Sequence, residues 1–182
     1  PFPSRTRKLS SIAPMVLHGK PVWESRTLPV FIFSLYLYIT LNMQQIESFK
    51  STSPEETFNF AKKFAKSIDY GSVIFLIGEL GSGKTTFSKG FSKGLGFDDI
   101  ISSPTYPILN EYSSSHHYLY HFDLYRLKSV GEFLEIGGLE YLSNKKAITL
   151  IEWPELIDSI DINNKIEIRF DHVSENERLI NL

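Results

Sequence analysis

The pattern of apolar and polar positions changes period several times after residue 43, and each change predicts a new element. Residues 53–69 begin with Ser53 and Glu56, whose spacing is that of a helix capping box. Apolar side chains then fall on one helical face, at Phe60, Ala61, Phe64, Ala65 and Ile68. This pattern predicts an amphipathic helix that ends before Gly71.

Three continuous apolar runs predict strands that are covered on both faces. They are residues 72–77 (SVIFLI), 118–123 (YLYHFD) and 147–152 (AITLIE). A helix is predicted between the first two runs, because Phe87, Phe91 and Leu95 recur at helical spacing. Its expected stop signals are Gly94 and Gly96. Residues 107–112 (PILNEY), just before the second run, predict a further strand.

The last third of the chain alternates helical and extended patterns. Ser129 and Glu132 repeat the capping-box spacing, and Gly137-Gly138 divides the segment that follows into two short helices. Residues 165–170 (KIEIRF) alternate like a half-exposed strand, and residues 178–182 (RLINL) are expected to pair with them. The order of elements favours an α/β fold with a mainly parallel central sheet, flanked by helices, and an antiparallel edge.

Residues 1–42 follow none of these patterns. A start rich in Pro, Ser and Arg leads into 14 nearly apolar residues at 28–41, fewer than the roughly 20 that a membrane-spanning helix requires. We expect residues 1–42 to be an extension outside the fold, disordered or not native, and residues 43–182 to form one domain. A targeting or anchoring segment and a genuine added element are the alternatives.

Charge and composition narrow the classes of function. The net charge of −2 divides into +4 over residues 1–42 and −6 over residues 43–182. A body this acidic is unsuited to gripping nucleic acid through its own surface. The chain has no cysteine, which excludes a disulfide scaffold, a thiolate zinc site and a cysteine nucleophile. We expect a cytoplasmic protein that does not associate with membranes.

Residues 78–85 (GELGSGKT) match the phosphate-binding loop G-x-x-x-x-G-K-[ST] and lie between a predicted buried strand and a predicted helix. Glycines let backbone N–H groups surround a phosphate, and the helix adds the positive end of its dipole. Lys84 is expected to reach the β- and γ-phosphates, Thr85 to bind Mg²⁺ and Thr86 to lie near the α-phosphate. The predicted fold class is therefore P-loop NTPase-like. The predicted nucleotide-binding residues of this segment are Glu79, Leu80, Gly81, Ser82, Gly83, Lys84, Thr85 and Thr86.

Two carboxylates end predicted buried strands, Asp123 after YLYHF and Glu152 after AITLI. In open α/β sheets the carboxyl ends of the strands form the ligand crevice. A Mg²⁺-bound nucleotide needs an acidic residue opposite the phosphate loop. One carboxylate would hold the metal, directly or through water, and the other would orient the attacking water or sense the γ-phosphate. The spacing leaves open which residue has which role.

Three features near these carboxylates have a functional and an ordinary interpretation. Residues 103–106 (SPTY) suit a switch segment, in which Thr105 orders against a γ-phosphate, or a simple ST-turn. Arg126 would stabilise phosphate charge or, in the favoured interpretation, pair with Glu132. His121 is interpreted as a histidine of the core or its rim.

Four blocks in the order GELGSGKTTF, SPTY, HFDLYRL and IEWPE closely resemble the TsaE (YjeE) family of small bacterial P-loop ATPases. The resemblance runs from about Met43 to the C-terminus and leaves out residues 1–42. It implies ATP and Mg²⁺ as cofactors and slow hydrolysis by the protein alone. It also implies TsaD and TsaB as partners in making threonylcarbamoyladenosine (t6A) beside the tRNA anticodon. Such a protein would meet tRNA only indirectly, through the complex.

The same resemblance implies roles for individual residues. Thr85 and Glu152 would be linked to the metal, with Asp123 on the γ-phosphate side of the same metal site. Lys84, Asp123 and Glu152 are the expected catalytic residues. Thr105 would belong to a switch-like loop and Trp153 would flank the site. Thr52, or with equal standing Ser53, would contact the nucleotide from the start of the first helix.

Three other functions share a phosphate loop of this kind. A nucleoside or small-metabolite kinase usually adds a lid with several arginines, whereas residues 43–182 contain only Arg126, Arg169 and Arg178. A GTP switch protein needs Asn-Lys-x-Asp after a strand, and residues 143–147 (SNKKA) lack the Asp and precede a strand. A purely regulatory nucleotide-binding module is the third alternative, which loss of hydrolysis in Lys84 and Glu152 variants would exclude.

Overall fold

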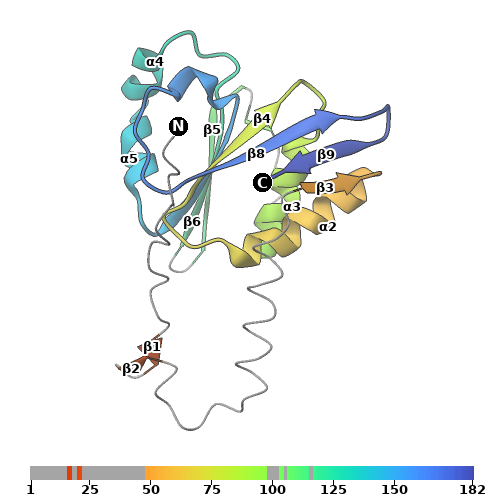
Figure 1. Ribbon diagram of the computed structural model, residues 1–182. Coiled ribbons are helices and arrows are strands. Elements are labelled where there is room, and N and C mark those ends of the chain that lie inside the picture. Colours follow the sequence, from red (N-terminus) through yellow and green to blue (C-terminus); the bar gives the residue numbers. More distant parts are fainter. Residues whose placement is uncertain (1–15, 18–19, 22–47, 98–102, 105, 115–116) are drawn as a thin grey trace, which may run out of the picture. The chain divides into compact units, whose positions relative to one another are not determined.

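The computed structural model describes residues 16–17, 20–21, 48–97, 103–104, 106–114 and 117–182 (Figure 1). The chain divides into two compact units, Pro1–Asn42 and Met43–Leu182. In the first unit, β1 (Val16–Leu17) and β2 (Lys20–Pro21) pair in antiparallel fashion. The apolar run at 28–41 lies outside the described residues. Within the part of the chain that is described, no helix has the length and apolar character needed to cross a bilayer.

The second unit is built on a seven-stranded sheet whose order is β3-β9-β8-β4-β7-β6-β5. Its central strands β8, β4, β7 and β6 are parallel to one another, and both margins are antiparallel. The strands are β3 (Ser48–Ser51), β4 (Val73–Gly78), β5 (Leu109–Ser113), β6 (Tyr118–Asp123), β7 (Ala147–Glu152), β8 (Lys165–His172) and β9 (Arg178–Asn181). The predicted α/β architecture is confirmed.

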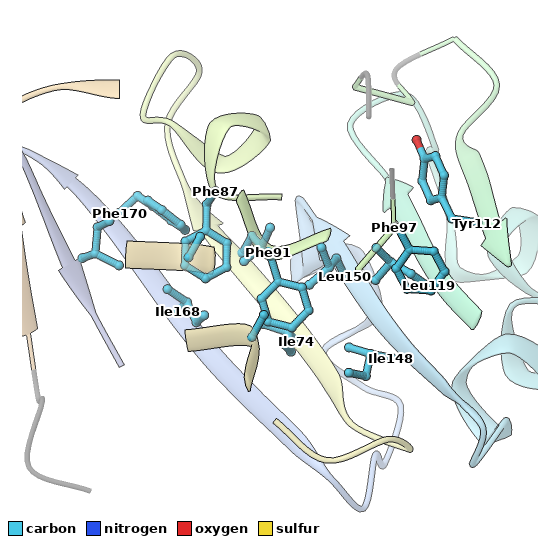
Figure 2. Packing of buried hydrophobic residues seen from close by; sticks show 14 residues of the cluster. Ile74, Phe87, Phe91, Phe97, Tyr112, Leu119, Ile148, Leu150, Ile168 and Phe170 are labelled. Atoms are coloured by element: carbon cyan, nitrogen blue, oxygen red, sulfur yellow. The ribbon is translucent and has the colours of Figure 1, made fainter. Parts of the chain in front are cut away.

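Helices cover both faces of this sheet. They are α2 (Pro54–Phe64), α3 (Lys84–Leu95), α4 (Val130–Glu135) and α5 (Gly138–Ser143), with the short 3₁₀ turns η2 (Ala65–Ser67) and η3 (Pro154–Ile157). Helices α2 and α3 bury Phe87 and Phe91 against Ile74 and Leu150 on one face (Figure 2). On the other face Phe133 of α4 and η3 pack with Phe75. Burying each such side chain contributes about 1.5–3 kcal/mol.

The two predicted capping boxes form, but in each the glutamate accepts a hydrogen bond from a different residue than expected. Ser53 and Ser129 cap α2 and α4, because each side chain accepts a hydrogen bond from the backbone N–H three residues later. Each glutamate, however, accepts from the residue before the cap and not from the cap itself. Glu56 Oε2 lies 2.7 Å from the Thr52 amide nitrogen, and Glu132 Oε2 lies 3.0 Å from that of Lys128. The carboxylates therefore fix the chain as it enters each helix.

One predicted helix stop is wrong. Gly94 lies inside α3, and the helix ends at Leu95 with Gly96 in the left-handed region as its C-cap. A Cβ atom at Gly90 would collide with the carbonyl of Phe58, and one at Gly94 with the carbonyl of Lys62. These two glycines allow α3 to lie directly against α2. Their absence of side chains serves helix packing, not termination.

Candidate functional site

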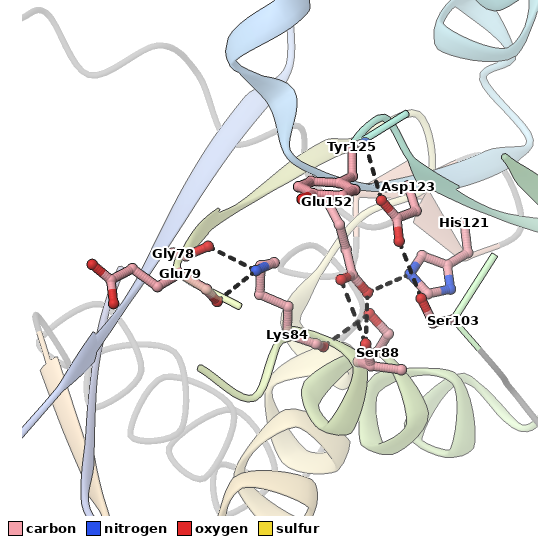
Figure 3. A network of polar contacts seen from close by, with 10 residues as sticks. Gly78, Glu79, Lys84, Ser88, Ser103, His121, Asp123, Tyr125 and Glu152 are labelled. Atoms are coloured by element: carbon pink, nitrogen blue, oxygen red, sulfur yellow. Dashed lines mark hydrogen bonds and ion pairs between the residues drawn. The ribbon is translucent and has the colours of Figure 1, made fainter. Parts of the chain in front are cut away.

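The register of the parallel strands brings together the two carboxylates that end them. Asp123 and Glu152 are direct partners in the pairing of β6 with β7, and Leu76 of β4 pairs with Glu152 from the other side. The chain leaves β4 at Gly78 and enters the phosphate loop (residues 78–85). Since all these strands point the same way, the loop and both carboxylates lie at one end of the sheet (Figure 3). Both carboxylates are buried.

The phosphate loop begins in a confined space. Gly78 has φ 155°, and a Cβ atom there would lie 2.7 Å from the carbonyl oxygen of Phe170 and 2.9 Å from Ser82 Oγ. Only glycine fits at the start of this turn. The loop then runs into α3 through Gly83, whose carbonyl accepts from the Phe87 amide at 2.9 Å. Helix α3 thus directs its free N-terminal amides toward the loop.

Lys84 is folded back over the loop. Its Nζ donates to the carbonyl oxygens of Gly78 and Glu79 at 2.7 and 2.9 Å (Figure 3). The ammonium also lies 4.3 Å from the centre of the Trp153 ring, a cation–π distance. Burial lowers the pKa of Lys84, while the negative charges of Glu152, Asp123 and Glu155 act in the opposite direction.

Trp153 reaches the cavity through an unusual backbone conformation. It follows β7 with φ 59° and ψ 53°, in the left-handed region, and it is the residue before η3. Holding a non-glycine residue there costs about 1–3 kcal/mol, and such strain concentrates at functional sites. The conformation turns the chain sharply after Glu152. It places the indole beside Lys84 and 5.1 Å from the ring of Tyr125.

Glu152 is held by two donors. Thr85 Oγ1 donates to its Oε1 at 3.2 Å and lies 3.5 Å from its Oε2. His121 Nε2 lies 2.9 Å from the same Oε1. The carboxylate therefore joins the first helical turn after the phosphate loop to the neighbouring strand.

Asp123 has a different set of donors. Ser103 Oγ donates to its Oδ2 at 3.1 Å, and the Tyr125 amide donates to its Oδ1 at 3.1 Å. Ser103 belongs to the predicted switch segment, so that segment contacts the strand-end acid. Thr105, which is predicted to order against a γ-phosphate, lies outside the described residues.

A cavity of about 220 Å³ lies between these parts. Its lining residues are Leu80, Gly81, Ser82, Gly83, Lys84, Thr85, Thr86, Ser103, Asp123, Glu152 and Trp153. Most of the predicted site residues are thus brought together around one hollow. The Glu79 side chain and Thr52 are not part of this lining. Thr52 is exposed, and its hydroxyl donates to Glu56 at 3.0 Å.

A larger hollow of about 670 Å³ lies at the opposite ends of the strands, near Tyr70, Val73 and Asn164. Its charged lining residues, Lys145 and Asp161, are exposed to solvent. It combines neither a phosphate loop nor buried carboxylates. The smaller cavity is therefore the candidate functional site.

Comparison with known proteins identifies the family. The family model described as threonylcarbamoyl adenosine biosynthesis protein TsaE matches residues 51–180. The chain belongs to the TsaE family. The protein named tRNA threonylcarbamoyladenosine biosynthesis protein TsaE of Bacillus subtilis is 38% identical over 138 residues, which cover 76% of this chain and 85% of that protein. Its namesake from Rickettsia bellii is 41% identical over 131 residues, 71% of this chain and 90% of that protein.

A solved structure supports the same assignment. The crystal structure of YdiB from Bacillus subtilis superposes with a TM-score of 0.60 at 34% sequence identity. The match covers 73% of this chain and 81% of that one. The fold of the TsaE family therefore extends over most of the second unit.

Two side chains of the HFDLYRL block (residues 121–127) make contacts that the sequence interpretation did not include. The Arg126 guanidinium lies 5.4 Å from the centre of the Tyr106 ring, in place of the expected pair with Glu132. His121 is fully buried, as interpreted, but it contacts Glu152. The i, i+2 spacing of His121 and Asp123 places both side chains on one face of the strand, but their nearness to Glu152 follows from the register of β6 with β7.

Proposed function

We propose that the chain is the Mg²⁺-dependent, ATP-binding and ATP-hydrolysing subunit of t6A synthesis, acting with TsaD and TsaB in the cytoplasm. The family assignment supports a place in t6A synthesis, since the relatives are named for it. The observation that carries the ATPase part is the contact between Thr85 and Glu152. A phosphate loop whose hydroxyl lies 3.2 Å from a buried strand-end carboxylate has the layout of a Mg²⁺-nucleotide site.

The donor set suits magnesium. Thr85, Glu152 and Asp123 offer hydroxyl and carboxylate oxygens, the ligands that Mg²⁺ prefers. The described residues contain no group of three or more His, Cys, Asp and Glu side chains arranged to hold a metal. Magnesium that arrives with a nucleotide needs few protein ligands, because phosphates and water supply the rest. When bound, it would neutralise charge on the β- and γ-phosphates. Thr85 and Glu152 would hold it, with Asp123 on the γ-phosphate side.

The protein's own residues would divide the remaining work. Backbone amides of residues 81–85 would surround the phosphates, and Lys84 would exchange its two loop carbonyls for phosphate oxygens. Desolvation strengthens that contact, since Lys84 is a buried residue. Asp123, fixed by Ser103 and the Tyr125 amide, would orient the attacking water.

Calorimetry of ATP binding with Mg²⁺ and with EDTA tests the cofactors directly. We expect affinity that depends on Mg²⁺ and is higher for ATP than for GTP. Hydrolysis should be slow for the isolated protein and faster with TsaD and TsaB. Absence of Mg²⁺-dependent ATP affinity would refute the proposal, and binding without hydrolysis under any condition would favour a regulatory module.

The acidic body suggests how tRNA is reached. Residues 43–182 carry a net charge of −6, so we propose that contact with tRNA goes through the partner proteins. Gel-shift titrations of tRNA with the chain alone, and with TsaD and TsaB added, test this division of labour. Tight, salt-sensitive binding by the chain alone would contradict it.

A further inference from the structure

His121 occupies a place where an apolar side chain would be expected. It lies in the middle of β6, is 0% exposed, and shares its face of the sheet with Leu119 and Asp123. Leu119 belongs to the core cluster beneath α2 and α3. A Leu or Phe at position 121 would extend that cluster and require no polar partner. The imidazole must therefore be explained by what its nitrogens contact.

The ring has a single polar contact among the described residues. Nε2 lies 2.9 Å from Glu152 Oε1, whereas Nδ1 has no hydrogen-bond partner in the described part of the chain. Because an ionised carboxylate only accepts, Nε2 is the donor. Leaving a buried polar atom unpaired is unfavourable, so a histidine here is costly unless its other nitrogen has a task. That task is directed at Glu152.

The contact determines how the carboxylate is oriented. His121 pairs with Leu150 across the parallel ladder, so Glu152 is its diagonal neighbour two residues further along β7. Oε1 accepts from both His121 (Figure 3) and Thr85, at 2.9 and 3.2 Å, whereas among the described residues Oε2 has only the 3.5 Å contact with Thr85. The imidazole therefore holds one oxygen toward β6 and leaves the other less engaged.

We propose that His121 is a positioning residue that holds Glu152 in the orientation that binds the Mg²⁺ of the nucleotide complex. This inference rests on the proposed function, since it requires Glu152 to be a metal ligand. His121 is not among the residues that line the cavity, so it would act through Glu152. Hydrogen-bonded partners of metal-binding carboxylates typically change metal affinity or activity about 10–100-fold when they are replaced.

The test uses the full chain and three variants. His121→Leu removes the donor and keeps an apolar fill, whereas His121→Gln places an amide N–H near the position of Nε2. Leu119→Ala is the matched control, because Leu119 lies on the same strand and face but makes no polar contact with Glu152. Thermal melts report stability. Electron paramagnetic resonance of Mn²⁺, titrated with a non-hydrolysable ATP analogue present, reports metal affinity. Calorimetry in EDTA reports nucleotide affinity without metal.

We expect His121→Leu to weaken Mn²⁺ binding about 10–100-fold, with metal-free nucleotide affinity unchanged within about twofold. His121→Gln should restore Mn²⁺ binding to within about threefold of wild type. Leu119→Ala should lower the melting temperature and leave Mn²⁺ binding unchanged. If wild type binds Mn²⁺ and His121→Leu binds it equally well, or if Gln fails to rescue, the role of His121 is refuted alone. If wild type itself shows no metal-dependent nucleotide binding, the proposed function fails, and this inference with it.

Discussion

The phosphate loop and the strand-end carboxylates face the same cavity, but they are built differently. The loop is one continuous stretch, residues 78–85, and its exposed Leu80 is 82% accessible to solvent. The carboxylates come from β6 and β7, far apart in sequence, and both are about 3% exposed. The loop presents backbone amides and one ammonium, whereas the carboxylates present oxygens that Ser103, Thr85 and His121 hold in place. The first side is suited to gripping a phosphate and the second to placing a metal or water.

Replacing Lys84 tests the phosphate loop and should have the largest effect. Lys84→Ala removes the only side-chain ammonium that lines the cavity as described, so we expect affinity for ATP to fall about 10²–10³-fold and hydrolysis with it. Calorimetry and a phosphate-release assay measure the two effects. Retained affinity for ATP would show that the backbone amides of the loop bind the phosphates without help from the ammonium.

Replacing Glu152 tests the strand-end carboxylates, and its effect should separate ATP binding from ATP hydrolysis. Glu152→Gln keeps the shape but removes the charge, so we expect hydrolysis to fall about 100-fold. ATP affinity measured in EDTA should stay within about twofold, since the carboxylate acts through the metal. An equal loss of affinity in EDTA would mean that the two sides are not functionally distinct.

A smaller effect is expected at the contact between Asp123 and Ser103 of the predicted switch segment. Ser103→Ala removes one donor to Asp123 Oδ2 and leaves the Tyr125 amide on Oδ1. Asp123 keeps other contacts, so the loss should be that of an ordinary hydrogen bond, about 0.5–1.5 kcal/mol, and hydrolysis should fall about twofold to tenfold. Steady-state kinetics check this, and Ser103→Thr, which keeps a hydroxyl, is the matched control. Equal activity of the Ala and Thr variants would contradict a positioning role for the hydroxyl.

The smallest effect concerns stability as a function of pH. Burial lowers the pKa of Lys84 in the folded protein below its ordinary value, so the folded state releases this proton at lower pH than the unfolded state. Between those two pKa values the unfolded state binds more protons, and stability rises with pH there. Wild type should therefore gain stability relative to Lys84→Met as the pH rises toward the ordinary pKa of lysine. Urea denaturation of both proteins at pH 7 and pH 10 gives the unfolding free energy of wild type minus that of Lys84→Met. We expect this difference to be more positive at pH 10, and a difference that falls with pH would contradict the prediction.

The contrast between one continuous segment and residues from separate strands also explains which parts of the molecule can be predicted from the sequence. The strands β4, β6 and β7 and the phosphate loop are predicted well, because composition and local spacing determine them. Strand β3 is not, since its residues SFKS carry no strand pattern and become extended by pairing with β9, as Phe49 does with Ile180. The helix position of Gly94 depends likewise on the neighbouring helix.

The site shows the same limit. The sequence identifies Asp123 and Glu152 as strand-end acids, but their donors come from other elements. The contact of His121 with Glu152 depends on the relative register of two strands, and the place of Arg126 over Tyr106 depends on a loop. Spacing along one chain segment contains neither quantity. Such spacing predicts which types of residue lie at the site, but not which side chains contact one another.

The glycines of α3 have a consequence for the opposite end of that helix. Lys84 and Thr85 are its first residues, and Gly90 and Gly94 rest on the backbone of α2. A helix of this length behaves as a stiff rod, so a methyl group added at either glycine would push the whole rod outward and carry the ammonium and hydroxyl with it. The distance between α2 and α3 therefore affects the geometry of the site, although neither glycine contacts the site.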